Sequence, residues 1–156
     1  MPTSHSEALL EVLRRELPLL EGIPEDVAAV KPGADRWSKK EELGHLIDSA
    51  ANNHVRFVTG SLQAEFVGPG YAQDGWVARH GYQAMTWASV REFWHGYNLF
   101  LAGVMERVPA TALGTPCRIG DGAAVTLEFV MTDYVLHMRH HLDKILERPE
   151  ITKYGA

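Results

Sequence analysis

Four long segments of this chain repeat apolar residues at the spacing of an α-helix, which restricts the fold to a helical class. In the first segment, for example, Leu9, Leu13 and Leu20 fall on one face of a helix. Helices of this number and length predict an all-α protein built as a four-helix bundle. The helices are expected at about 6–21, 38–63, 87–107 and 127–148.

The ends of these helices carry recognisable start and stop signals. Ser38 and Glu41 have the spacing of a capping box, in which each side chain satisfies a free backbone N–H group at a helix start. Thr126 is expected to cap the last helix. Pro109 and Pro149 are expected to end the third and fourth helices.

Two connections are rich in glycine and proline. The stretch FVGPGYAQDGWVARHGYQ (66–83) predicts a long loop between the second and third helices. Such loops often line or cover a site, and Trp76 is the candidate for the lid of a substrate pocket. Before the last helix, CRIGDGAAV predicts a small hairpin around Gly120–Gly122.

Composition limits the possible classes of protein. The 156 residues are 46% hydrophobic and carry a net charge of −5, so a single domain spanning 1–156 is expected and nucleic acid is not an expected partner. No apolar run approaches about 20 residues, so no membrane partner is expected. Cys117 is the one cysteine, which excludes an internal disulfide and fits a cytoplasmic location. A small-molecule substrate is the expected partner.

The segment DYVLHMRHHLDKIL contains a histidine pair suited to chelation. His137 and His141 lie four residues apart, about 40° from each other on a helix, and a helical wheel turns both toward the apolar stripe. His140 falls further out and is the alternate partner. His45, in another helix, is a candidate third ligand, and three protein ligands leave a position for water or substrate.

Other interpretations of these histidines stay open at this point. His45 shares a polar stripe with Asp48 and Asn52, which on periodicity alone favours a solvated surface residue. The functional interpretation is that the stripe lines a hydrated cleft, in which Asp48 or Asn52 would orient a ligand or a bound water. Histidines near the end of a helix also interact favourably with its dipole without any metal.

Two sequence blocks, WSKKEELGHLID and DYVLHMRHHL, resemble the DinB/YfiT-like superfamily of metal-dependent enzymes, and WHGYN on the third helix adds to the likeness. The resemblance covers nearly the whole chain. It implies a four-helix bundle that is commonly dimeric, with one divalent metal ion held by three histidines. The matching positions are His45, His137 and His141.

The resemblance also implies a range of activities. Characterised relatives include thiol S-transferases, which use low-molecular-weight thiols, and a thiol-dependent isomerase. Three imidazoles suit zinc, nickel or iron, and the metal would activate either water or a thiol. We therefore expect a hydrolase or a thiol S-transferase. The alternative is a non-catalytic metal- or ligand-binding bundle that forms a dimer.

Two carboxylates lie one helical turn from the candidate ligands. Asp48 follows His45 by three residues, and Asp133 precedes His137 by four. Each is a candidate general base. Each is at least as good a candidate for holding an imidazole in the required tautomer. A third interpretation is that both are plain residues on the helix surface.

Overall fold

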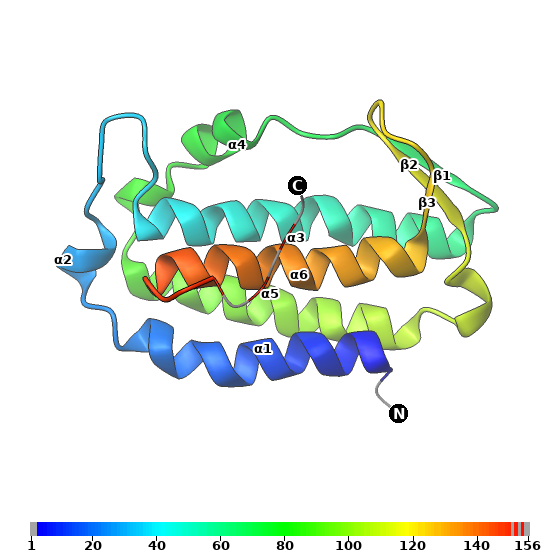
Figure 1. Cartoon of the computed structure of the whole chain (residues 1–156), viewed down its shortest axis with the longest axis horizontal. Helices are drawn as coiled ribbons and strands as arrows, with labels where there is room; N and C mark the ends of the chain where they lie inside the picture. Colours follow the sequence, from blue (N-terminus) through cyan, green and yellow to red (C-terminus); the bar gives the residue numbers. More distant parts are fainter. Residues whose placement is uncertain (1–2, 151, 153, 155–156) are drawn as a thin grey trace.

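Four long helices pack side by side in the computed structural model (Figure 1), which describes residues 3–150, 152 and 154. The all-α bundle is therefore confirmed. The expected single domain of residues 1–156 includes residues 1–2, 151, 153 and 155–156, which lie outside the described part. The long helices are α1 (Ser4–Glu21), α3 (Lys39–Leu62), α5 (Trp87–Arg107) and α6 (Leu127–Ile145).

The capping signals in the sequence lie at the helix starts. The Ser38 hydroxyl accepts a hydrogen bond from the Glu41 N–H at 3.2 Å, and the Glu41 carboxylate accepts one from the Ser38 N–H at 3.1 Å. The capping box at the start of α3 is therefore confirmed. Thr126 caps α6 in the same way, by accepting a bond of 3.0 Å from the Phe129 N–H.

Two helix ends differ from the prediction. The first helix begins at Ser4, two residues earlier than expected, because Thr3 supplies a capping box of its own. The last helix ends at Ile145 and not at Arg148. Glu147 has a left-handed backbone (φ 50°), a conformation that ends a helix before any proline is reached.

The order of the helices around the bundle differs from their order in the chain. Both α1 and α3 pack against α5 and α6, so helices consecutive in sequence, α1 with α3 and α5 with α6, sit diagonally. Because residues 63–86 return along the length of the bundle, α5 starts at the same end as α3 and the two run parallel (Figure 1). The antiparallel neighbour of α3 is α6, across the groove that holds the candidate site.

The returning segment contains short elements that its glycine and proline content did not predict. These are β1 (Phe66–Gly68), α4 (Gln73–His80) and the 3-10 turn η1 (Tyr82–Ala84). Gly81 ends α4 in the left-handed conformation (φ 68°), so the glycine acts as a helix stop. A further short helix, α2 (Glu25–Ala28), follows α1, and η2 (Ala110–Ala112) follows α5.

A small three-stranded sheet closes one end of the bundle. Strand β2 (Pro116–Ile119) pairs antiparallel with β3 (Val125–Thr126), which confirms the hairpin, and Gly120 adopts a positive φ of 59° in its turn. Strand β1 adds to β2 in parallel, with Phe66 opposite Cys117. A strand of three residues is too short to show an alternating pattern, so β1 was not predicted.

The core of the bundle is aromatic and aliphatic. Trp87 and Trp94 of α5 and Phe57 of α3 are almost wholly buried, and the Phe57 ring packs edge-on against Tyr134 of α6. Among the described residues, no helix combines the length and apolar character needed to cross a bilayer.

The outer face of α3 and α5 is apolar, although it faces solvent in the single chain. On α5, Phe93 and Phe100 are 53% and 57% exposed, and Val55 of α3 is 56% exposed. His54 joins the two helices, with its ring against Phe100 and its Nδ1 at 2.9 Å from the Tyr97 hydroxyl. We call these five residues the α3–α5 strip.

Candidate metal centre

Three histidines from two helices converge in the groove between α3 and α6. His45 comes from α3, and His137 and His141 come from successive turns of α6. One ring nitrogen of each lies within 4.8 Å of the others, and the Nε2 atoms of His45 and His137 are 3.2 Å apart. The helical pair and the third histidine that the sequence singled out are therefore brought together.

The nitrogen spacing fits chelation of one ion. Two nitrogens bound to one tetrahedral ion at about 2.0–2.1 Å would be about 3.3 Å apart. The 3.2 Å between His45 and His137 matches that value without movement of the helices. The donor set is three imidazoles, which is a ligand set of catalytic zinc sites.

A carboxylate orients one of the three rings. Glu42 contacts Nδ1 of His141 across the α3–α6 groove. When Nδ1 donates its proton to a carboxylate, Nε2 keeps its lone pair and becomes the available ligand atom. On the other side of the cluster, the Trp37 ring lies 4.9 Å from the His45 ring and covers it.

Burial keeps two of these histidines uncharged. The pKa of His45 falls to about 4 and that of His137 to about 3, mainly because burial disfavours the protonated ring. The neighbouring His141 lowers both further. Both rings are therefore neutral at pH 7, which is the state that binds a metal ion.

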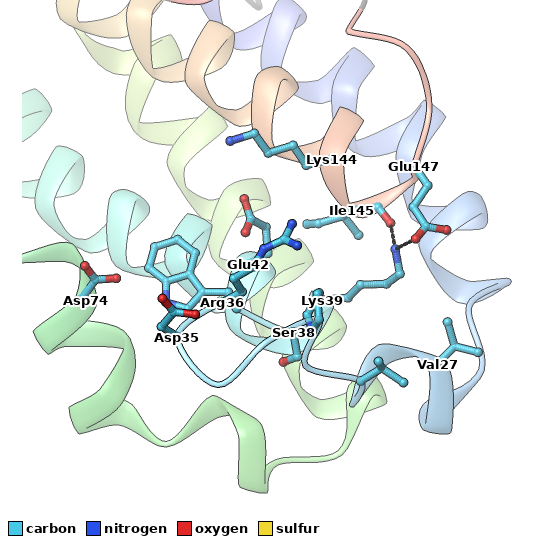
Figure 2. A pocket seen from close by; sticks show the side chains of 13 residues that line it. Val27, Asp35, Arg36, Ser38, Lys39, Glu42, Asp74, Lys144, Ile145 and Glu147 are labelled. Atoms are coloured by element: carbon cyan, nitrogen blue, oxygen red, sulfur yellow. Dashed lines mark hydrogen bonds and ion pairs between the residues drawn. The ribbon is translucent and has the colours of Figure 1, made fainter.

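Two cavities lie near the cluster: one is lined by two residues that contact it, and the other by His137 itself. The larger, of about 790 Å³, lies between the segment 30–39, α4 and the end of α6. Figure 2 shows Asp35 and Arg36 on one wall of this cavity and Lys144 and Glu147 on another. Its lining includes Trp37, which packs against His45, and Glu42, which contacts His141.

The smaller cavity, of about 180 Å³, has a candidate ligand in its wall. His137 lines it, together with polar residues of α3 and α6. Asp133 lies there too, and its Oδ2 accepts a hydrogen bond of 3.0 Å from the Tyr154 hydroxyl. The Tyr154 ring packs 5.3 Å from that of His137. Burial raises the pKa of Tyr154, and the nearby Asp133 raises it further, so the hydroxyl stays a donor.

Comparison with known proteins identifies the family. A model of the DinB superfamily matches residues 8–145 of the chain. The chain belongs to the DinB superfamily. This agrees with the resemblance of its two histidine-containing sequence blocks. Among curated proteins, no significant match to the chain is found.

A solved structure supports the same fold. The chain is similar to YfiT from Bacillus subtilis, described as a probable metal-dependent hydrolase with an unusual four-helix bundle topology. The two share 18% sequence identity and superpose with a TM-score of 0.78. The similarity covers 92% of this chain and 82% of YfiT. At this identity the likeness concerns the fold.

In this DinB protein, Asp48 follows His45 by one turn of α3 and bonds to partners outside the cluster. It is 1% exposed, and its Oδ1 lies 2.7 Å from both the Tyr82 hydroxyl and Nδ1 of His80. The pKa of Asp48 is raised by burial, and these two hydrogen bonds partly oppose that effect. Asp48 therefore joins α3 to the segment that carries α4 and η1.

Trp76, the residue singled out as a lid, lies on α4. It is half-buried, and its ring packs 5.6 Å from that of Tyr71 and 5.5 Å from that of His80. Tyr71, and not Trp76, lines the smaller cavity. Trp76 thus packs against other residues of the returning segment. Its role as the lid of a pocket stays a prediction.

The structure shows which histidines belong to the cluster, a question that the helical periodicity of the sequence left open. The surface interpretation of His45 is wrong, because the residue is 0% exposed and its Nε2 lies 3.2 Å from Nε2 of His137 on α6. His140, the alternate partner, turns away and contacts Glu150. Glu42 was missed as a partner of the cluster, although it lies three residues before His45 and hence on the same side of α3.

Proposed function

We propose that this protein is a metal-dependent enzyme of the hydrolase type, with His45, His137 and His141 as the metal ligands. The observation that carries the proposal is the 3.2 Å spacing of the His45 and His137 Nε2 atoms beside a cavity lined by His137. The description of YfiT as a probable metal-dependent hydrolase supports the same class of reaction. A divalent ion at this position would lower the pKa of a coordinated water toward about 7 and so supply a nucleophile.

The protein's own residues supply the remaining functions. Glu42 fixes the tautomer of His141, and Trp37 shields His45 from solvent. Asp133 is the carboxylate that shares a cavity with His137, so we assign it the role of proton acceptor. Tyr154 donates a hydrogen bond to Asp133 and holds the carboxylate in place.

Thiol transfer is the second candidate, and the two cavities favour it. A transferase binds two substrates, and here one cavity is lined by Trp37 and Glu42, the neighbours of His45 and His141, while the other is lined by His137. A thiol in one cavity and an acceptor in the other would meet at the histidines. A metal can also lower the pKa of a bound thiol and make it a nucleophile.

The test begins with the metal content of the purified protein. We expect about one ion per chain in the wild type after incubation with zinc, nickel or iron, since three ligands make one site. His137→Ala should lose the ion. His140→Ala, which removes a neighbouring histidine outside the cluster, should keep it. A wild type that binds none of these ions would refute the proposal.

Activity then separates an enzyme from a non-catalytic bundle. With the metal bound, Asp133→Asn should lower kcat for ester hydrolysis by roughly 10²–10⁴-fold, the usual contribution of a general base. Metal content should not change. If the wild type binds metal but turns over neither esters nor thiol-transfer substrates, the non-catalytic alternative is supported.

A further inference from the structure

The smaller cavity contains a buried arginine that the metal site does not use. Arg56 of α3 is 9% exposed and lines the cavity together with His137 and Asp133. Burial lowers the pKa of Arg56 from its usual value, with no carboxylate among the opposing causes. A guanidinium held this far from solvent normally has an acidic partner.

No such partner is present in the part of the chain that the structure describes. There, no ion pair joins Arg56 to an aspartate or glutamate within 4.0 Å. Its hydrogen bonds go to neutral acceptors and are long, 3.4 Å to the Asn53 side chain and 3.3 Å to the Pro69 carbonyl. A guanidinium carries five N–H donors, so most of its capacity for strong hydrogen bonds is unused.

Helical geometry aligns this arginine with the histidine cluster. Arg56 follows His45 by 11 residues on α3, which turns it only about 20° from the direction of His45. The same count separates the two Cα atoms by about 16 Å along the axis, and His137 of the cluster lines the same cavity as Arg56. Ser49 and Asn53 line the cavity between them.

We propose that the smaller cavity binds a small organic acid, with its carboxylate on Arg56 and its reactive end at the histidine cluster. This inference rests on the proposed function and names the substrate class of that site. The planar fork of a guanidinium matches the two oxygens of a carboxylate. Asp133 in the same cavity disfavours more highly charged anions, so a monoanion fits better than a phosphate dianion.

The volume of the cavity limits the size of the acid. At about 180 Å³ it slightly exceeds the cavity of about 150 Å³ known to admit benzene. Ile119, Val125 and Phe129 supply apolar wall near the sheet. An acid the size of benzoate, with one apolar ring, therefore matches both the space and its lining.

Benzoate and its neutral analogue benzamide are the probes for this site. Titration calorimetry is run on metal-free and zinc-loaded protein separately, so that the subsite is tested without the metal. We expect metal-free wild type to bind benzoate roughly thirtyfold more tightly than benzamide, because a desolvated charge pair forms only with the acid. Equal affinity for the two probes would refute the inference.

Variants show whether Arg56 is the residue responsible. Arg56→Gln should weaken benzoate binding by roughly thirtyfold and leave benzamide binding unchanged. Arg107→Gln, which removes an exposed arginine on α5, is the matched control and should change neither. If Arg56 only supports the loop through Pro69, its replacement will lower stability but not the preference for benzoate, and the inference fails.

A second variant covers the case in which Arg56→Gln does not fold. Arg56→Lys keeps the charge but loses the fork, so the preference for benzoate should shrink by roughly tenfold without disappearing. An unchanged preference would refute the role of Arg56. Since these measurements use metal-free protein, they can succeed even if the metal proposal fails, and the two failures remain distinguishable.

Discussion

At the scale of single residues, the contact between Glu42 and His141 is the one most open to test. The carboxylate orients the imidazole and raises its basicity as a ligand. We expect Glu42→Gln to weaken zinc affinity by roughly 10–100-fold, measured by competition with a chromogenic chelator. Glu92→Gln, an exposed change on α5, is the control. Equal affinity in all three proteins would show that Glu42 does not support the site.

The buried histidines also predict how stability depends on pH. In the folded metal-free protein the pKa values of His45 and His137 are about 4 and about 3, whereas unfolded histidine titrates near pH 6.5. Between these values the unfolded chain binds more protons. The two neutral rings therefore make their full contribution to the free energy of unfolding above about pH 6.5. That contribution is lost as the pH falls toward 4 and 3.

Urea unfolding at about pH 7.5 and about pH 5 measures this effect in metal-free protein. His137→Gln removes one titrating ring and should reduce the loss of stability between the two pH values. His140→Gln removes a histidine outside the cluster and should leave the loss as in the wild type. Identical pH dependence in both variants would contradict the assignment.

At the scale of elements, Gly44 fixes how closely η1 packs on α3. A Cβ at Gly44 would overlap the Tyr82 ring, whereas a Cβ at Gly96 of α5 meets nothing within 4 Å. In Gly44→Ala, overpacking against Tyr82 should cost about 1–3 kcal/mol of folding stability. The higher helix propensity of alanine offsets about 1 kcal/mol of that cost. Gly96→Ala should stabilise the protein by about 0.5–1 kcal/mol.

Thermal unfolding of these two matched variants gives the answer. For a chain of this size, each kcal/mol shifts Tm by about 2–4 °C. We expect the Tm to fall for Gly44→Ala and to rise for Gly96→Ala. A rise in both would mean that Tyr82 moves aside without cost, and that η1 is not held against α3.

The long helices could be predicted because each carries its own signal. The capping box at Ser38 and the apolar stripe of α3 are local, and they mark the helix within a residue of its observed ends. Helix α4 lacks such a signal, since Gly75 lies in its first turn and its N-cap residue, Ala72, has no side chain that can cap. Contacts with the rest of the chain, such as the one between His80 and Asp48, hold it in place.

The candidate site likewise has features that one helix determines and features that depend on contacts between helices. The spacing of His137 and His141 is a property of one helix, so the pair could be found in the sequence. The burial of His45 depends on α6 packing against α3, and no pattern within α3 records that contact. The unpaired state of Arg56 likewise depends on which side chains other segments bring near, so it required the structure.

At the scale of the whole molecule, the α3–α5 strip predicts a second copy of the chain. Large exposed aromatic side chains such as Phe93 and Phe100 are typical of surfaces that become buried on association. The parallel pair α3 and α5 offers a continuous face that a symmetry-related pair can cover. We propose a homodimer through this face, as the resemblance to the family implies.

Light scattering tests the dimer directly. The wild type should have twice the 17.4 kDa mass of one chain, and Phe100→Glu should reduce it to a monomer by placing a charge in the interface. Leu19→Glu changes an equally exposed side chain on α1 and should leave the dimer intact. A wild type with the mass of one chain would rule the interface out.

The diagonal order of the helices also determines when the histidine cluster can exist. His45 and His137 are 92 residues apart, and α6, the last helix of the bundle, carries two of the three rings. At the usual 5–20 residues per second, a ribosome adds the second ring roughly 5–18 s after the first. During that interval α3 has no α6 to pair with, and its polar stripe stays open to water. An ion that needs all three rings must therefore bind after translation has passed His141. The metal ions available to the chain at that time determine which ion the site acquires.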